Sequence, residues 1–179
     1  MRWDVDPVHS TIGFAVKHMM VATVHGRFGR VRGTLELDPA APEDAKAELV
    51  IDAASVDTNM PRRDEHLRSA DFFDARRFPE IPFRTTEVHA LGGAKFRVDG
   101  ELTIRDVTRP VTVDAELSGV YPDAKRGDRI GISFRSSIDR TDFGLGWNQA
   151  LEAGGVLVGD IVRLEVELAA VRQAEALAA

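Results

Sequence analysis

The chain has 179 residues, a formal net charge of −6 and no cysteine. Its length is enough for one domain with a substantial core, and its negative charge argues against binding nucleic acid or anionic membranes through charge. The absence of cysteine excludes disulfides, cysteine nucleophiles and cysteine-based zinc sites. We expect a single domain over residues 1–171, followed by a C-terminal tail over residues 172–179.

The first residues, MRWDVDP, contain no apolar segment of the kind found in a signal peptide. No apolar run in the chain approaches membrane-spanning length, so no integral membrane segment is predicted. These two observations predict a cytoplasmic location, or a periplasmic or exported one if a leader has been removed.

Alternating apolar and polar residues predict β-strands through the first part of the chain. The alternation covers residues 12–16, 24–28, 31–37 and 47–53. The apolar positions change from even to odd numbers at Gly29, where a one-residue bulge would keep the apolar side chains on one face of the sheet.

The segment Asp57–Pro79 interrupts this alternation and is predicted to contain a short helix. Its two adjacent aromatic residues, Phe72 and Phe73, need an apolar partner. Two interpretations remain open: the two rings plug the end of a β core, or they form a lid over a cavity.

Strand alternation resumes at Ile81 and continues over residues 81–85, 96–104, 111–117, 130–138 and 158–168. Each strand is apolar on one face and charged on the other, which is typical of an antiparallel sheet with one wet face. About eight strands joined by tight turns favour a sheet that closes into a barrel and so removes its edges. The predicted fold is all-β: an antiparallel barrel of about eight strands, with a short helical insert capping one end.

The same alternation identifies the side chains that would point into this barrel. They are Phe14, Val16, Phe28, Leu35, Leu37, Leu49, Ile51, Phe83, Phe96, Val98, Leu102, Ile104, Val111, Val113, Ile132, Phe134, Ile138, Val162, Leu164 and Val166. A barrel of this size can be filled by its own side chains or can hold one ligand. The residues alone favour the filled core.

The five histidines raise the alternative of a hydrolase or a metal-dependent enzyme that uses His9 or His18. Ser10 with one of these histidines and Asp6 would supply the residue types of a catalytic triad. However, the chain has no HExxH motif for zinc and no GxSxG elbow to expose a serine. His18 shares the inward parity of the first strand and is expected to be a hydrogen-bonded barrel histidine.

Several segments, in order through nearly the whole chain, resemble the YceI family of lipocalin-like barrel proteins. They are WDVDPVHSTIGFAVKHMM (Trp3–Met20), VHGRFGRVRG (Val24–Gly33), RRDEHLRSADFFDARRFPEIPF (Arg62–Phe83), VDGELTIRDVTRPV (Val98–Val111), DRTDFG (Asp139–Gly144) and VGDIVRLEVEL (Val158–Leu168). Asp106 departs from the family, whose members usually have glycine there, and this departure is expected to change only a hairpin turn.

The resemblance implies a non-catalytic protein for the binding, storage or transport of a long isoprenoid lipid. The lipid would be a polyprenyl pyrophosphate or an isoprenoid quinone, held among the inward residues and His18. Its head would meet Arg62, Arg63, Trp147 and Asn148 at a mouth closed by Phe72 and Phe73. For Trp147 a role as an anchoring aromatic is favoured, and for the arginines a solvated helix face with ion pairs to Asp64, Glu65 and Asp71 is the open alternative. No cofactor, metal or nucleic acid is expected. Whether the chain forms a homodimer is left open.

Overall fold

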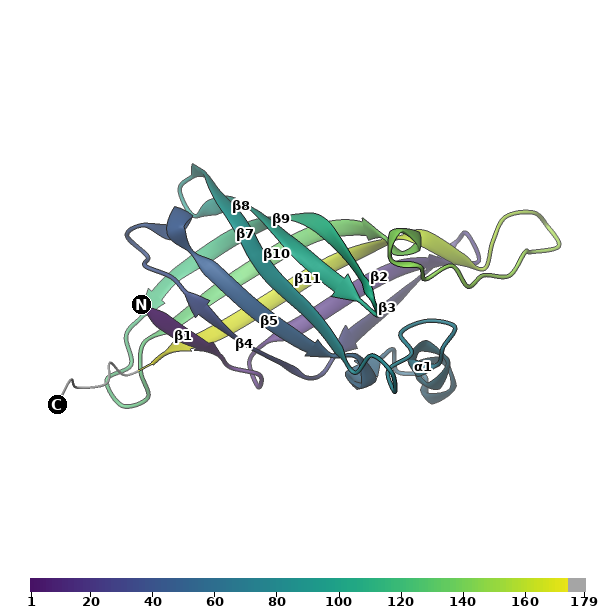
Figure 1. Ribbon diagram of the computed structural model, residues 1–179, viewed down its shortest axis with the longest axis horizontal. Coiled ribbons are helices and arrows are strands. Elements are labelled where there is room, and N and C mark those ends of the chain that lie inside the picture. Colours follow the sequence, from purple (N-terminus) through teal and green to yellow (C-terminus); the bar gives the residue numbers. More distant parts are fainter. Residues whose placement is uncertain (174–179) are drawn as a thin grey trace.

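The structure is a computed structural model that describes residues 1–173. It consists of β-strands with one α-helix and three short 3₁₀ turns (Figure 1). The strands are β1 (Arg2–Val5), β2 (Thr11–His18), β3 (Ala22–Phe28), β4 (Val31–Glu36), β5 (Lys46–Asp52), β6 (Val56–Asp57), β7 (Glu80–Gly92), β8 (Lys95–Ile104), β9 (Val107–Tyr121), β10 (Arg129–Asp139) and β11 (Val158–Arg172). The helix is α1 (Pro61–Arg68), and the 3₁₀ turns are η1 (Pro42–Asp44), η2 (Ala53–Ser55) and η3 (Arg140–Phe143).

The strands form a closed antiparallel barrel, as predicted. β1 pairs with β4 on one side and with β11 on the other, which closes the ring β1-β4-β5-β7-β8-β9-β10-β11. β2 follows β1 along the same edge of β11, and β3 precedes β4 in the same way, so that each pair acts as one interrupted strand. Counted like this, the chain runs up and down around eight strands.

The predicted change of parity at Gly29 is confirmed. Phe28 and Val31 are both buried although they are three residues apart, because the chain leaves strand geometry between β3 and β4. The Gly29 N–H donates instead to the carbonyl of Ser55 in η2, at 3.1 Å.

The end of the barrel near the N-terminus is closed by tightly packed side chains. Trp3 is only 1% exposed and its indole N–H donates to the Leu37 carbonyl at 2.9 Å. Ile130 and Ala170 are equally well buried and belong to the same core cluster. Figure 1 shows α1 at the opposite end of the barrel.

Helix α1 is held against η2 and β6 by polar contacts. The Asp64 carboxylate accepts hydrogen bonds from the backbone N–H and the hydroxyl of Thr58, at 2.8 and 2.6 Å. Arg68 donates to the carbonyls of Ala54 and Val56, at 2.8 and 2.9 Å. These contacts fix the short helix at the barrel end although its own eight residues would be marginal as an isolated helix.

The barrel wall is incomplete on the α1 side. β9 and β10 are paired only where Asp114–Tyr121 faces Arg129–Arg135. Among the described residues, the β10 segment Ser136–Asp139 therefore pairs with β11 alone and is unpaired on its β9 side. The Ser136 hydroxyl donates to the Thr112 carbonyl at 2.7 Å and gives the two strands one further link. Beyond this point β10, β11, β2 and β3 continue as a curved sheet (Figure 1).

Strand β11 runs through Arg172, one residue into the segment predicted as the tail. The rest of that prediction, from residue 174 onward, lies outside the described residues. Within residues 1–173, no helix combines the length and the apolar character needed to cross a membrane.

Candidate functional site

The interior of the barrel is the candidate site, because nearly every predicted inward residue packs there. All of them except Val16, Val162 and Leu164 belong to the apolar core clusters. These three lie on the paired strands β2 and β11, where Val16 is opposite Val162 and Phe14 is opposite Leu164. They are half-buried, so the interior is more accessible on the α1 side than near Trp3.

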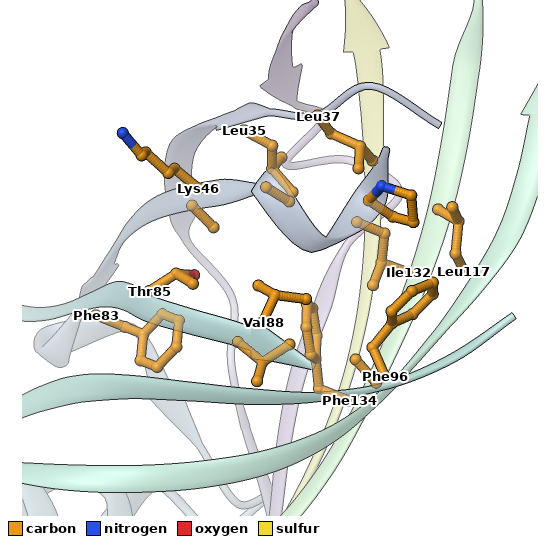
Figure 2. Close-up of a pocket in the computed structure, with 15 residues that line it drawn as sticks. Leu35, Leu37, Lys46, Phe83, Thr85, Val88, Phe96, Leu117, Ile132 and Phe134 are labelled. Atoms are coloured by element: carbon orange, nitrogen blue, oxygen red, sulfur yellow. The ribbon is translucent and has the colours of Figure 1, made fainter. Parts of the chain in front are cut away.

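A small apolar cavity of about 60 Å³ lies within the barrel (Figure 2). Its lining is Leu35, Leu37, Pro42, Ala45, Lys46, Ala47, Phe83, Thr85, Val88, Phe96, Val98, Ala115, Leu117, Ile132 and Phe134. Ala47, Thr85, Ala115 and Leu117 share the inward parity of predicted neighbours and could have been found from it. Pro42 and Ala45 come from the η1 turn, where alternation gives no signal.

The cavity is smaller than the ~300–1,000 Å³ typical of a ligand site. A long ligand would therefore need interior side chains to move apart. Phe83, Val88, Leu117 and Phe134 are the large half-buried side chains of the lining, so we expect these to be displaced first. A larger hollow of about 930 Å³ crosses β10, β11, β2 and β3, but charged side chains such as Arg135, Arg163 and Glu165 line it, so it does not suit hydrocarbon.

The two aromatic residues of the insert have different partners. The Phe73 ring contacts Phe28 edge-on with centroids 5.4 Å apart, and Phe28 contacts Phe14 at 5.6 Å. Phe73 therefore extends the interior core towards α1. The Phe72 ring lies outside this stack, 5.1 Å from His66 and 5.5 Å from Trp147.

Trp147 connects the β10–β11 loop to the insert. Its ring lies 4.6 Å from His66 in an edge-on arrangement, in addition to its contact with Phe72. It thus anchors the loop, as expected for this residue, and the cluster of Phe72, His66 and Trp147 covers the barrel end from outside.

Arg140 holds the base of the same loop, and sequence patterns did not identify it. The side chain is buried and donates to the carbonyls of Leu145, Trp147 and Gly159, the last two at 2.9 Å. Burial lowers the pKa of its guanidinium, although the nearby carboxylate of Asp160 opposes this shift. Arginine remains protonated at neutral pH, so the loop is pinned by a buried cation.

The predicted head-group residues are engaged in local contacts to different extents. Arg63 donates to the hydroxyl and the carbonyl of Thr58, at 2.7 and 3.0 Å. The amide of Asn148 donates to the Val158 carbonyl and accepts from the Val158 N–H, at 2.8 and 3.0 Å. Arg62 is exposed and makes no hydrogen bond or ion pair with any described residue, so it is the one free to meet a ligand.

The expectation that His18 is hydrogen-bonded is wrong: its side chain forms no hydrogen bond with any of residues 1–173. It is the last residue of β2, and its strand neighbours are Ala22 and Val158, which offer no polar side chain. His18 is half-buried beside the β2–β3 turn.

The side chains considered for a catalytic triad serve the turn between β1 and β2. The Ser10 hydroxyl donates to the backbone carbonyl of Asp6 at 2.7 Å and accepts from the Ala169 N–H at 3.1 Å. His9 Nδ1 lies 2.8 Å from the Asp6 carboxylate, and no hydrogen bond joins Ser10 to either histidine within the described chain. Ser10 is thus held as a structural donor and acceptor.

One group of three metal-ligand residues occurs in the part of the chain that the structure describes, and it includes neither His9 nor His18. It consists of Glu87, His89 and Asp99, whose ligand atoms lie within 4.8 Å of one another. Asp99 also accepts a hydrogen bond from Thr112, which is the main reason that its pKa is lowered. The His89 side chain is hydrogen-bonded to the Asp99 carboxylate at 3.1 Å on the outer surface.

Asp6 provides a prediction about pH. Its pKa is lowered below the usual 3.8, mainly by the hydrogen bond with His9 and further by the Val8 N–H and Arg129. This contribution to stability is therefore complete above pH 3.8 and is lost as the pH falls through the lower pKa of the folded state. Asp6→Asn should cost about 1–2 kcal/mol at neutral pH, and the difference from wild type should shrink only below pH 3.8.

Urea unfolding of both proteins across the acidic range measures this difference, with Glu36→Gln on the exposed face of β4 as the control. A difference that stays constant down to the acid limit would contradict the assignment to Asp6.

Comparison with known proteins gives one consistent result. Residues 3–170 match the family model described as a YceI-like domain. A UPF0312 protein of Staphylococcus aureus strain N315 is 36% identical over 161 residues, which are 89% of this chain and 91% of that protein. The crystal structure of a Campylobacter jejuni YceI protein is 30% identical, with a TM-score of 0.76, and the match covers 88% of this chain and 90% of the other.

A third similarity concerns the fold alone. A domain from Saccharophagus degradans, described as a polyisoprenoid binding domain implicated in plant cell wall breakdown, has a TM-score of 0.70 but 17% identity. The match covers 96% of this chain and 98% of that domain.

Proposed function

Because the chain belongs to the YceI family, we propose that its barrel binds a long isoprenoid lipid in the interior and carries out no reaction on it. The lipid is a polyprenyl pyrophosphate or an isoprenoid quinone. The observation that carries this proposal is the continuous apolar interior of the ring, with half-buried aliphatic residues on the α1 side and a small cavity further in.

The energetics favour such a ligand without any catalytic group. An apolar tail gains ~0.8 kcal/mol for each CH₂ that it buries, so about twenty groups would gain ~16 kcal/mol. Association and ordering cost ~4–15 kcal/mol, and separating the interior side chains adds to that cost. A long chain can meet these costs where a short one cannot.

The α1 side is the proposed route into the barrel. Strands β9 and β10 separate there, and Val16, Val162 and Leu164 keep part of their surface accessible. The S. degradans domain supports the proposal only through its shared architecture. The enzyme alternative receives no support from Ser10, whose hydroxyl is committed to backbone groups.

Arg62 allows the head group to be tested without disturbing the fold. Arg62→Glu removes no contact made by the described residues, whereas a change at Arg63 would break its bonds to Thr58. If Arg62 lies at the head, its reversal should weaken a pyrophosphate-headed lipid about tenfold or more, as expected for a charge-assisted bond. A neutral isoprenoid quinone should be affected little.

Each lipid is titrated into the protein from micelles, and binding is measured as the change in the melting temperature of the protein. Equal weakening of both lipids would remove Arg62 from the head-group site. If neither lipid changes the stability of the wild-type protein, the carrier function itself is contradicted.

A further inference from the structure

Two loops at the α1 end expose apolar side chains where hairpins normally carry polar ones. The turn of the β2–β3 hairpin contains Met19, Met20 and Val21, which are 50%, 60% and 83% exposed. Val156, in the loop between β10 and β11, is 38% exposed. We call these four residues the apolar tip.

The two loops form one surface. The Met19 N–H donates to the Leu157 carbonyl at 2.8 Å. The Met20 side chain lies over Gly155 so closely that a β-carbon there would be 3.1 Å from it. Both loops project beyond α1 at the same end of the barrel (Figure 1).

The backbone of the hairpin turn makes its composition unusual. Met19 and Met20 have φ angles of 52° and 67°, in the left-handed region that favours glycine and asparagine. Methionine at both positions is unfavourable for the backbone and also leaves apolar surface in water. Because this choice strains the backbone and exposes apolar side chains, an external apolar partner explains it.

The two loops carry almost no charge, and this indicates what kind of partner they meet. Residues 19–22 and 150–157 contain one charged side chain, Glu152, so little charge would have to leave water if the tip entered an apolar medium. Four side chains on a narrow projection cannot supply the ~800 Å² per partner that a stable protein interface buries. A bilayer requires no such complementary surface, because aliphatic side chains only need to reach below its head groups.

We propose that the apolar tip inserts into the surface of a lipid bilayer and brings the open side of the barrel to the membrane. The uptake or delivery of lipid at that surface rests on the proposed function, whereas the docking itself does not. The tip and the accessible residues Val16 and Val162 lie on the same strands, β2 and β11, or on the loops that continue them. A lipid leaving the membrane beside the tip would therefore meet the apolar interior directly.

The test is flotation with vesicles of phosphatidylcholine that contain no isoprenoid. The combined variant Met19→Asn, Met20→Asn and Val21→Ser removes the apolar surface and places asparagine at two left-handed positions that it tolerates. Its melting temperature should equal or exceed that of wild type. Its association with vesicles should fall about tenfold or more, given the apolar area removed.

A matched pair of single variants controls for general loss of apolar surface. Val8 and Val21 are 82% and 83% exposed, but Val8 lies before β2 and Val21 follows it, so they are at opposite ends of that strand. Val21→Ser should reduce flotation, whereas Val8→Ser should not. Equal losses for the two, or flotation of the combined variant like wild type, would overturn the proposal.

Two further measurements separate the possible failures. Wild-type protein that never floats, or that forms a dimer which the combined variant loses, would also overturn membrane docking. Loading with isoprenoid quinone in micelles tests the interior independently of the tip. The combined variant should bind as much lipid there as wild type but exchange it with vesicles about tenfold more slowly, in proportion to the lost docking.

Discussion

Phe73→Ala should destabilise the protein by about 2–4 kcal/mol, close to the ~3–5 kcal/mol for a fully buried phenylalanine. Its ring contacts Phe28 edge-on, and Phe28 in turn contacts Phe14, so its removal leaves a gap at the end of the core. Phe72→Ala should instead loosen the contact between the insert and Trp147. Because Phe72 is only 7% exposed, this variant should also lose stability. The effect that distinguishes it from Phe73→Ala is faster release of bound lipid, because changes in affinity appear mostly in the dissociation rate.

Unfolding of the empty protein in urea and release of a loaded isoprenoid quinone measure these two effects separately. We infer from these contacts that Phe73 is the plug and Phe72 the lid. Unchanged stability of Phe73→Ala would contradict its role in the core. Unchanged release from Phe72→Ala would show that the outer cluster does not control access.

Arg140→Met should cost about 3 kcal/mol or more, because each buried carbonyl left without a partner costs ~1–3 kcal/mol. The carbonyls affected are those of Leu145, Trp147 and Gly159. Since the same loop carries Trp147 to the insert, the variant should also lose protection of loop amides from hydrogen exchange.

Arg140→Lys provides the control for charge. Lysine keeps the cation but cannot donate to several carbonyls in fixed directions, so it should recover less than half of the lost stability. Full recovery by lysine would mean that charge, and not the set of hydrogen bonds, holds the loop. If only amides of β10 and β11 lost protection from exchange, Arg140 would stabilise these two strands and not the loop between them.

The sequence predicted the barrel well because its strands expose one face and bury the other. In β8 the alternation from Phe96 to Ile104 is uninterrupted, since β9 pairs with all of this strand and β7 with Lys95–Leu102. The insert was located for the opposite reason, as it lacks alternation. Its exact start was not predictable, because Met60 holds the cap position and makes no side-chain cap hydrogen bond.

Other features of the site depend on contacts between distant segments and left no local pattern. Arg140 is a charged residue in a polar stretch, and only the fold shows that its partners are carbonyls of a returning loop. Alternation likewise cannot show where β9 and β10 separate, because Val111 and Ile138 keep inward parity past the last paired residues. Phe72 and Phe73 are neighbours in sequence, yet a turn directs them to different partners.

Native mass spectrometry of protein loaded with an isoprenoid quinone tests most directly whether the lipid lies inside the barrel. Ala115→Phe places a ring in the cavity that Ala115 lines, at a cost of about 1–3 kcal/mol for overpacking. Glu116→Phe places the same ring at the neighbouring, exposed position and is the matched control. Wild type and Glu116→Phe should each retain one lipid per barrel, and folded Ala115→Phe should retain much less; equal retention by all three would contradict binding in the interior.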